Sequence, residues 1–318
     1  MIWKPLSPAA LHWCALERQF SVPVSTILNP KLTGQNQLIN MRDYLMENRK
    51  ITFIGAGNMA HAIIAGLVRT GYPAGLITVC SPNTTRRDVL AKEYGINSEN
   101  DNIRYAQEAD VIVLAVKPQM MEEVCDSLRS QIDFSHKLVL SIAAGIPVSR
   151  FYTLLQDQLN IIRIMPNTPA LVGQGLSGLF APEHVTQPDR QFTESLMCGV
   201  GKVCWVNDEN GINNIIAVAG SAPAYFFLFM ESMQQEAERL GFDSQTAREL
   251  VLQAVTGSAK LAESQADLPF AILREQVTSK GGTTAEALRI FYEGHLPEIV
   301  SRAMQAAIRR AQEMEKLF

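Results

Sequence analysis

The amino-acid sequence predicts an α/β fold, in which an N-terminal doubly wound parallel sheet is followed by an all-helical C-terminal domain. Apolar runs with the length of buried strands alternate with helical patterns from about residue 47 to residue 207. This alternation is typical of a parallel sheet covered by helices on both faces. Beyond Val206 only helical spacing remains. The chain has 318 residues, which is long enough for two domains and a sizeable core.

The first domain, residues 47–207, is expected to begin with a buried strand at 51–54. A helix then runs from Asn58 to Thr70 and is closed by Gly71. The elements expected after it are a strand at 76–80, a helix at 84–94, and strands at 110–116, 137–142 and 161–165.

The second domain, residues 208–318, is expected to begin with a long apolar helix from Gly211 to Leu240 that contains Pro223. A helix from Ser244 to Glu263 follows, with Asp243-Ser244 as its N-terminal cap. Three shorter helices complete the chain, the last from about Pro297 to Lys316. Because so apolar a first helix often packs against another copy, we expect a homodimer or a larger homo-oligomer formed through these helices.

The composition excludes several classes of protein. Hydrophobic residues make up 47% and charged residues 19% of the chain, as in ordinary globular enzymes. A formal net charge of −4 gives no basic surface for nucleic acid or an anionic membrane, and no uninterrupted apolar stretch is long enough to cross a bilayer. The five cysteines and five histidines are scattered without metal-ligand spacing. We therefore expect no metal site, no disulfide framework and a cytoplasmic location.

Residues 1–46 differ from the rest of the chain. Prolines, few charges and no clear period predict a poorly ordered extension. Met41 and Met46 both precede the first strand, so an over-long gene start is one interpretation, and an organelle address is a second.

A glycine pattern follows the first predicted strand and opens the first helix. The pattern is G-x-G-x-x-A, in which one glycine permits a tight turn, the next lets a pyrophosphate approach the backbone, and the final small residue lets helix and strand pack closely. This placement predicts a Rossmann-type dinucleotide site. The residues expected to contact the cofactor here are Gly55, Gly57, Asn58, Met59 and Ala60.

The end of the second strand indicates which dinucleotide binds. An NAD site usually has Asp or Glu there, to bond the ribose hydroxyls. This chain instead reads Cys80-Ser81-Pro82-Asn83-Thr84-Thr85-Arg86-Arg87, with no carboxylate to repel a 2′-phosphate. We therefore favour NADPH, with NADH possible. The alternative is a polar helix cap with solvated arginines.

A second candidate site lies between two helical patterns, at residues 277–288. Ser279, two glycines and two threonines lead into a helix, whose N-terminus attracts anions. Such a loop can hold a small carboxylate without any arginine. An ordinary loop with a Ser or Thr helix cap is the alternative.

With these motifs placed, the chain from about Lys50 onward resembles the pyrroline-5-carboxylate reductases. The resemblance rests on six ordered landmarks rather than on any one of them. They are Gly55–Ala60, Ala115–Pro118, Ser141–Gly145, Arg163–Pro169, Gly220–Tyr225 and Ser279–Thr284.

The resemblance implies reduction of 1-pyrroline-5-carboxylate to L-proline by NAD(P)H, the last step of proline biosynthesis. It places the substrate carboxylate on Ser279, Gly281, Gly282 and Thr283, and it gives Thr284 the role of hydrogen-bonding the ring nitrogen. It also implies cofactor contacts. Those contacts fall on Ser81, Asn83, Asn102, Ala115, Lys117 and Pro118.

Two positions depart from the family pattern. Lys280 stands where most relatives have proline, which frees the φ angle and adds a cation near the carboxylate site. Leu268 stands where a histidine is usual.

Three other functions fit part of the sequence. A β-hydroxyacid dehydrogenase needs a catalytic lysine soon after Gly220, yet the next lysine is Lys260. A reductase of another cyclic imine needs the same parts with a different pocket. A non-catalytic NADPH-binding regulator needs the glycine turn but has no use for Ser279–Thr284.

Overall fold

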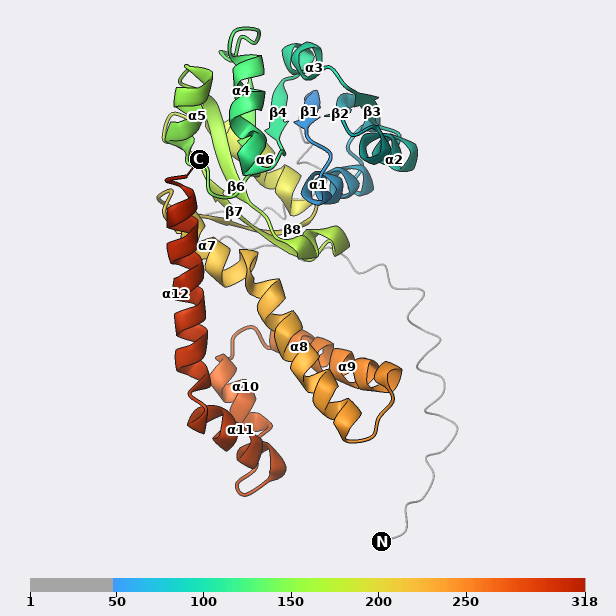
Figure 1. The fold of residues 1–318 in the computed structure, drawn as a ribbon, viewed down its shortest axis with the longest axis vertical. Coiled ribbons are helices and arrows are strands. Elements are labelled where there is room, and N and C mark those ends of the chain that lie inside the picture. Colours follow the sequence, from blue (N-terminus) through green and yellow to red (C-terminus); the bar gives the residue numbers. More distant parts are fainter. Residues whose placement is uncertain (1–47, 318) are drawn as a thin grey trace, which may run out of the picture. The chain divides into compact units, whose positions relative to one another are not determined.

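The computed structural model describes residues 48–317, so the extension expected at residues 1–46 lies outside the described residues. The described chain contains one mixed sheet of eight strands in the order β3-β2-β1-β4-β5-β6-β7-β8 (Figure 1). The strands are β1 (Ile51–Ile54), β2 (Ile77–Cys80), β3 (Asn97–Glu99), β4 (Val111–Leu114), β5 (Leu138–Ser141), β6 (Asn160–Met165), β7 (Gly175–Phe180) and β8 (Gly201–Trp205).

The doubly wound fold is confirmed, with one correction to the parallel sheet. Adjacent strands are parallel except for β6 and β7, which pair antiparallel. Only a short 3-10 segment, η4 (Thr168–Val172), connects these two strands. A parallel pair needs a much longer crossover connection. Because this connection is short, the chain reverses direction and β7 pairs antiparallel with β6.

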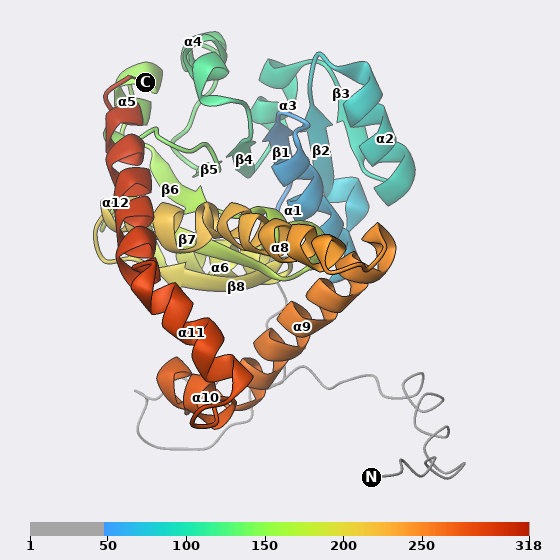
Figure 2. The same ribbon diagram turned by 60° about the horizontal axis from the view of Figure 1, so that its bottom comes forward.

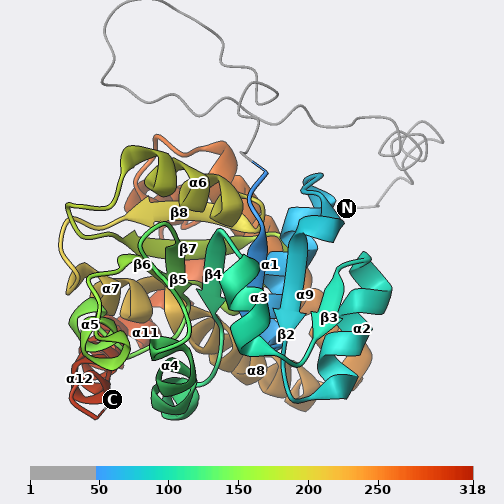
Figure 3. The same cartoon turned by 90° about the horizontal axis from the view of Figure 1, so that it is seen from above.

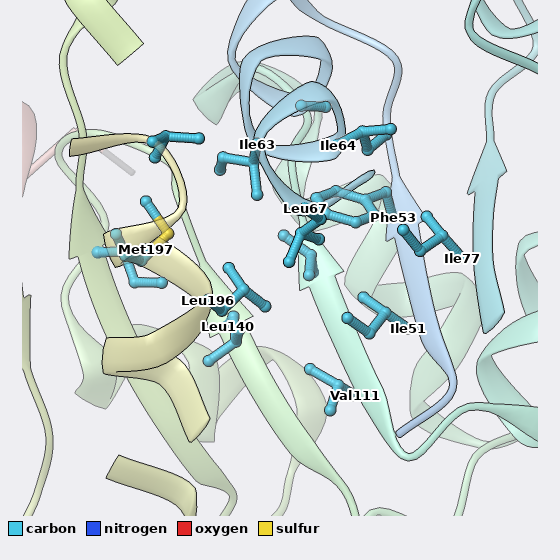
Figure 4. Packing of buried hydrophobic residues seen from close by; sticks show 14 of the residues in the cluster. Ile51, Phe53, Ile63, Ile64, Leu67, Ile77, Val111, Leu140, Leu196 and Met197 are labelled. Carbon is cyan, nitrogen blue, oxygen red and sulfur yellow. The ribbon is translucent and has the colours of Figure 1, made fainter. Parts of the chain in front are cut away.

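Helices cover both faces of the sheet (Figures 1 and 3). One cluster of buried side chains joins Ile51 and Phe53 of β1 to α1, α2 and α6, and Figure 4 shows part of this packing. A second cluster joins Ile54 of the same strand to α3, α4 and α5. Alternate residues of a strand point to opposite faces, so one short apolar strand serves both clusters. The helices are α1 (Asn58–Arg69), α2 (Thr84–Tyr94), α3 (Asn102–Glu108), α4 (Met121–Arg129), α5 (Val148–Leu155) and α6 (Gln187–Cys198).

The C-terminal region is helical, as expected, but its first helix is broken (Figure 2). The break lies in η5, a π-helical turn in which the Ser221 N–H donates to the carbonyl of Ile216, five residues earlier, at 2.7 Å. Pro223 then occupies the first turn of the next helix, where proline is tolerated. The segments are α7 (Gly211–Ile215), η5 (Ile216–Gly220), α8 (Ala222–Arg239), α9 (Ser244–Ser264), α10 (Phe270–Gln276), α11 (Thr283–Glu293) and α12 (Leu296–Met314).

These helices expose much apolar surface in a single copy. Phe226, Phe227 and Leu228 of α8 are each more than 60% exposed, and α8, α10 and α11 contain no buried residue. By length and composition alone, the helical stretch Gly211–Arg239 is long and apolar enough to cross a membrane. A single such segment is weak evidence for a membrane.

The end of α12 returns to the sheet at Arg163 of β6. This arginine is 1% exposed, and its Nη1 lies 2.9 Å from Glu315 Oε1 and 3.0 Å from Glu209 Oε1. Glu209 also accepts from the Val148 N–H at the start of α5, at 2.7 Å. One buried cation therefore joins β6, α5 and the end of α12.

Candidate functional site

The turn between β1 and α1 has the geometry of a phosphate-binding loop. Gly55 has a φ of +112°, and a Cβ there would lie 2.5 Å from the carbonyl oxygen of Ala115. At Gly57, by contrast, a Cβ would meet no atom closer than 4.0 Å. Gly57 begins α1 without any side-chain cap, so the first N–H groups of the helix stay available for a pyrophosphate.

The rest of the glycine motif fits α1 to the sheet. Ala60 is 1% exposed, so its small side chain is what lets the helix lie close against the strands. Met59 is half-buried and packs on the same core, whereas Asn58 is exposed at the first position of the helix. Of these three residues, Asn58 is the most exposed.

The end of β2 has features of both interpretations offered by the sequence, a site for a 2′-phosphate and a polar helix cap. Asn83 Oδ1 accepts from the Arg86 N–H at 3.1 Å and so caps α2, as the alternative required. Arg87 Nη1 donates to the Ser81 carbonyl oxygen at 2.9 Å, which holds that guanidinium against the strand end. The Arg86 side chain is exposed and has no hydrogen bond or ion pair to another described residue, and residues 81–87 after this strand include no carboxylate.

The remaining expected cofactor residues lie at the ends of β3 and β4. Asn102 is the first residue of α3, and its Oδ1 is buried without a hydrogen-bond partner among the described residues. Ala115 lies against the glycine turn, and Lys117 is exposed at the start of the 3-10 segment that begins with Pro118. Ligands of open α/β sheets bind outside these carboxyl strand ends.

The second candidate site is a tight turn that opens α11. The Gly282 N–H donates to the Ser279 carbonyl oxygen at 3.0 Å, and Gly281 has a φ of +71°. This is the pattern of a type II turn, with Lys280 at the position that favours proline and glycine at the position that requires a positive φ. Gly282 is less constrained, because the nearest atom to a Cβ there, Ser279 Oγ at 2.3 Å, belongs to a side chain that can rotate.

Within the described part of the chain, no side chain caps the N-terminus of α11. The alternative of an ordinary Ser or Thr cap is therefore not what the structure shows. Thr283 and Thr284 form the first turn of the helix, and both are exposed in a single copy, as is Ser279. Hydroxyls and uncapped N–H groups together suit a small anion.

The two candidate sites lie in different places within one copy. Figures 1 and 2 show the α10–α11 connection at the end of the helical region away from the carboxyl ends of β1 and β4. The structure thus brings the cofactor residues together and the turn residues together, but not the two groups with each other.

The sequence patterns assign no individual role to Asn167. This residue is 9% exposed, and its side chain connects the turn after β6 with η5 and β7. A signal was present in the sequence, because Pro223 inside a helical pattern leaves the carbonyl four residues earlier without its donor.

Comparison with known proteins agrees with this layout. Residues 209–314 match the family described as pyrroline-5-carboxylate reductase dimerisation, and residues 50–145 match the one described as NADP oxidoreductase, coenzyme F420-dependent. A pyrroline-5-carboxylate reductase of Vibrio alginolyticus is 59% identical over 273 residues, which are 86% of this chain and 100% of the relative.

Two solved structures extend the comparison. A pyrroline-5-carboxylate reductase of Coxiella burnetii superposes with a TM-score of 0.79 at 40% identity, over 84% of this chain and 99% of that one. The Plasmodium falciparum enzyme, solved with NADP bound, gives 0.75 at 27% identity, over 85% and 99%.

These similarities confirm the resemblance and the two-part fold predicted from the sequence. The dimerisation match supports a homo-oligomer, and the relationship as a whole supports a soluble protein. With such identity over the full length of its relatives, this chain belongs to the pyrroline-5-carboxylate reductase family.

Proposed function

We propose that this chain reduces 1-pyrroline-5-carboxylate to L-proline with NADPH as the preferred hydride donor. The observation that carries the proposal is the Ser279–Gly282 turn, which opens an uncapped helix in a chain that also has a dinucleotide turn. A regulator that only bound NADPH would have no use for this second anion site.

The residues present fit the cofactor. A Cβ on Gly57 would meet no atom closer than 4.0 Å, and Arg86 is exposed and unpaired among the described residues. The Oδ1 of Asn102, unpartnered among the same residues, lacks the partner that a bound nucleotide can supply. NADPH, when bound, supplies the hydride.

The protein's own task is to bind and orient the substrate. A protonated cyclic imine is already electrophilic at its C=N carbon, so no Ser-His-Asp or paired-carboxylate machinery is required. The N–H groups of Thr283 and Thr284 and the Ser279 hydroxyl bind the substrate carboxylate. The Thr284 hydroxyl orients the ring nitrogen.

The active site is completed between two copies of the chain. This inference rests on the separation of the cofactor turn and the substrate turn within one copy, and on the exposed apolar side chains of α8. A second copy covers those side chains, which gives a homodimer or a larger homo-oligomer, with no membrane and no nucleic acid involved. A cytoplasmic location stays a prediction.

Oxidation of NADPH in the presence of racemic 1-pyrroline-5-carboxylate tests the function, with NADH in a parallel assay. Rapid turnover that is faster with NADPH is the expected result. A folded protein that binds NADPH but turns over only another cyclic imine would redefine the substrate, and one inactive on every imine would be a regulator.

Thr284→Ala should lower kcat/KM by roughly 10- to 100-fold, because one hydrogen bond near the transition state is lost. NADPH affinity should stay as in the wild type. Thr284→Ser keeps a hydroxyl and serves as the control, with activity expected near that of the wild type. Unchanged kinetics in Thr284→Ala would remove this hydroxyl from the mechanism.

Arg86→Gln should raise the KM for NADPH by roughly 10-fold, since a charge-assisted contact to the 2′-phosphate is lost. The KM for NADH is the internal control and should not change, because NADH has no phosphate there. Equal changes for both cofactors would show that Arg86 does not read the 2′-phosphate.

A further inference from the structure

The turn that follows β6 is tied to two other segments by one buried side chain. Asn167 Nδ2 donates to the Ala219 carbonyl oxygen in η5 at 3.1 Å. Its Oδ1 accepts from the Leu176 N–H in β7 at 2.8 Å. The side chain is 9% exposed, so both bonds form away from water.

The hydrogen bond to the Ala219 carbonyl oxygen replaces the helical hydrogen bond that Pro223 cannot donate. In an α-helix the carbonyl of residue 219 pairs with the N–H of residue 223, and proline has none. The Ala224 N–H, one residue further on, donates to the Ser221 carbonyl oxygen at 3.1 Å and is not used by Ala219. Asn167 thus supplies, from another part of the chain, the donor that the helix itself lacks.

Close packing fixes the same junction. A Cβ on Gly220 would lie 2.9 Å from Met165 Cε at the end of β6, and one on Gly178 would lie 2.8 Å from Ile215 Cγ1 and Cγ2. The broken helix therefore lies against the strand end whose following turn carries Asn167. Since η5 leads directly into α8, its position sets where the whole helical region begins.

We propose that Asn167 is a positioning residue, which fixes the junction between the sheet and the helical region and thereby aligns the substrate turn with the cofactor. This inference rests on the proposed reductase function. Asn167 acts through the Ala219 carbonyl, since its amide donates to Ala219 and accepts from Leu176 within the chain. Its loss should lower kcat and leave NADPH binding intact, because the glycine turn belongs to a different part of the sheet.

A double-mutant cycle with Pro223→Ala tests the proposal. Pro223→Ala restores an N–H that can pair with the Ala219 carbonyl oxygen, so Asn167 becomes dispensable for that bond. Asn167→Leu should lower kcat roughly 10- to 100-fold in the wild-type background and only a few-fold in the Pro223→Ala background. The lost bond to Leu176 is common to both backgrounds and cancels. The NADPH Kd, measured by fluorescence titration without substrate, should change by less than about 3-fold in every variant.

Equal losses of kcat in the two backgrounds would overturn the proposal, and so would a fall in NADPH affinity that accounts for the lost activity. If Asn167→Leu does not fold alone, Asn167→Asp enters the same cycle, because it keeps the acceptor for Leu176 and replaces the donor with a carboxylate oxygen. If the wild type proves inactive on 1-pyrroline-5-carboxylate, the proposed function fails separately. The wild type and the three variants are then compared by the urea concentration at the midpoint of unfolding. If the shift in the double variant equals the sum of the two single shifts, Asn167 and Pro223 are not coupled.

Discussion

Gly55→Ala is expected to lower NADPH affinity about 100-fold or more. The methyl group would stand 2.5 Å from the Ala115 carbonyl oxygen and 2.7 Å from its carbon, and both are backbone atoms that cannot swing aside. The turn between β1 and α1 must therefore move by about an ångström, and displacements of that size at a binding site cost about two orders of magnitude. The NADPH Kd from fluorescence titration gives the result directly.

Gly71→Ala is the matched control for this substitution. Gly71 also has a positive φ, +93°, but a Cβ there meets no atom within 4 Å. It therefore shares the backbone strain of about 1 kcal/mol that alanine suffers in this region, without the collision. Gly71→Ala should bind NADPH normally. If both variants lose affinity alike, general destabilisation rather than the Ala115 contact is the cause.

Arg163→Met is expected to reduce the free energy of unfolding by about 3 kcal/mol, as when one partner of a buried ion pair is removed. The arginine is 1% exposed and forms ion pairs with Glu209 and Glu315, which come from separate segments. Their carboxylates are each about one-quarter exposed, so water compensates part of the loss and the effect lies at the low end of the usual range. Urea denaturation at one fixed protein concentration measures it, since stability in an oligomer depends on concentration.

Arg289→Met is the control, because Arg289 forms ion pairs with Glu286 and Glu293 on the exposed face of α11. Surface pairs of this kind contribute about 0.5 kcal/mol or less. Stability that is equal or higher in Arg163→Met would show that the desolvation of this arginine outweighs its two ion pairs. Part of its guanidinium, Nε and Nη2, is indeed buried without a partner among the described residues.

Burial explains which strands could be predicted from the sequence. Strands such as β1 and β4 are buried on both faces, so they appear as uninterrupted apolar runs. β3 is a polar three-residue edge strand. β7 contains Gly178 because Ile215 occupies the space that a side chain would need. That glycine interrupts the apolar pattern by which the strand could be predicted. The local sequence around a strand does not show which residues from other segments will pack against it.

The candidate site shows the same limit. Gly55, Gly57 and the turn at Ser279 could be found because each requirement is local, either a backbone angle or a close approach. That the two sites do not meet within one copy depends on how five C-terminal helices are arranged, which no short pattern encodes. The hydrogen bond from Asn167 to Ala219 spans 52 residues, so local sequence patterns cannot predict which residue donates to the Ala219 carbonyl oxygen.

The ion pair between Arg163 and Glu315 also bears on synthesis of the chain. The two residues are 152 positions apart. A growing chain folds from its N-terminus as it leaves the ribosome, so the sheet forms while Arg163 still lacks one of its two carboxylates. A chain interrupted before residue 315 would leave this buried arginine with one ion-pair partner in place of two.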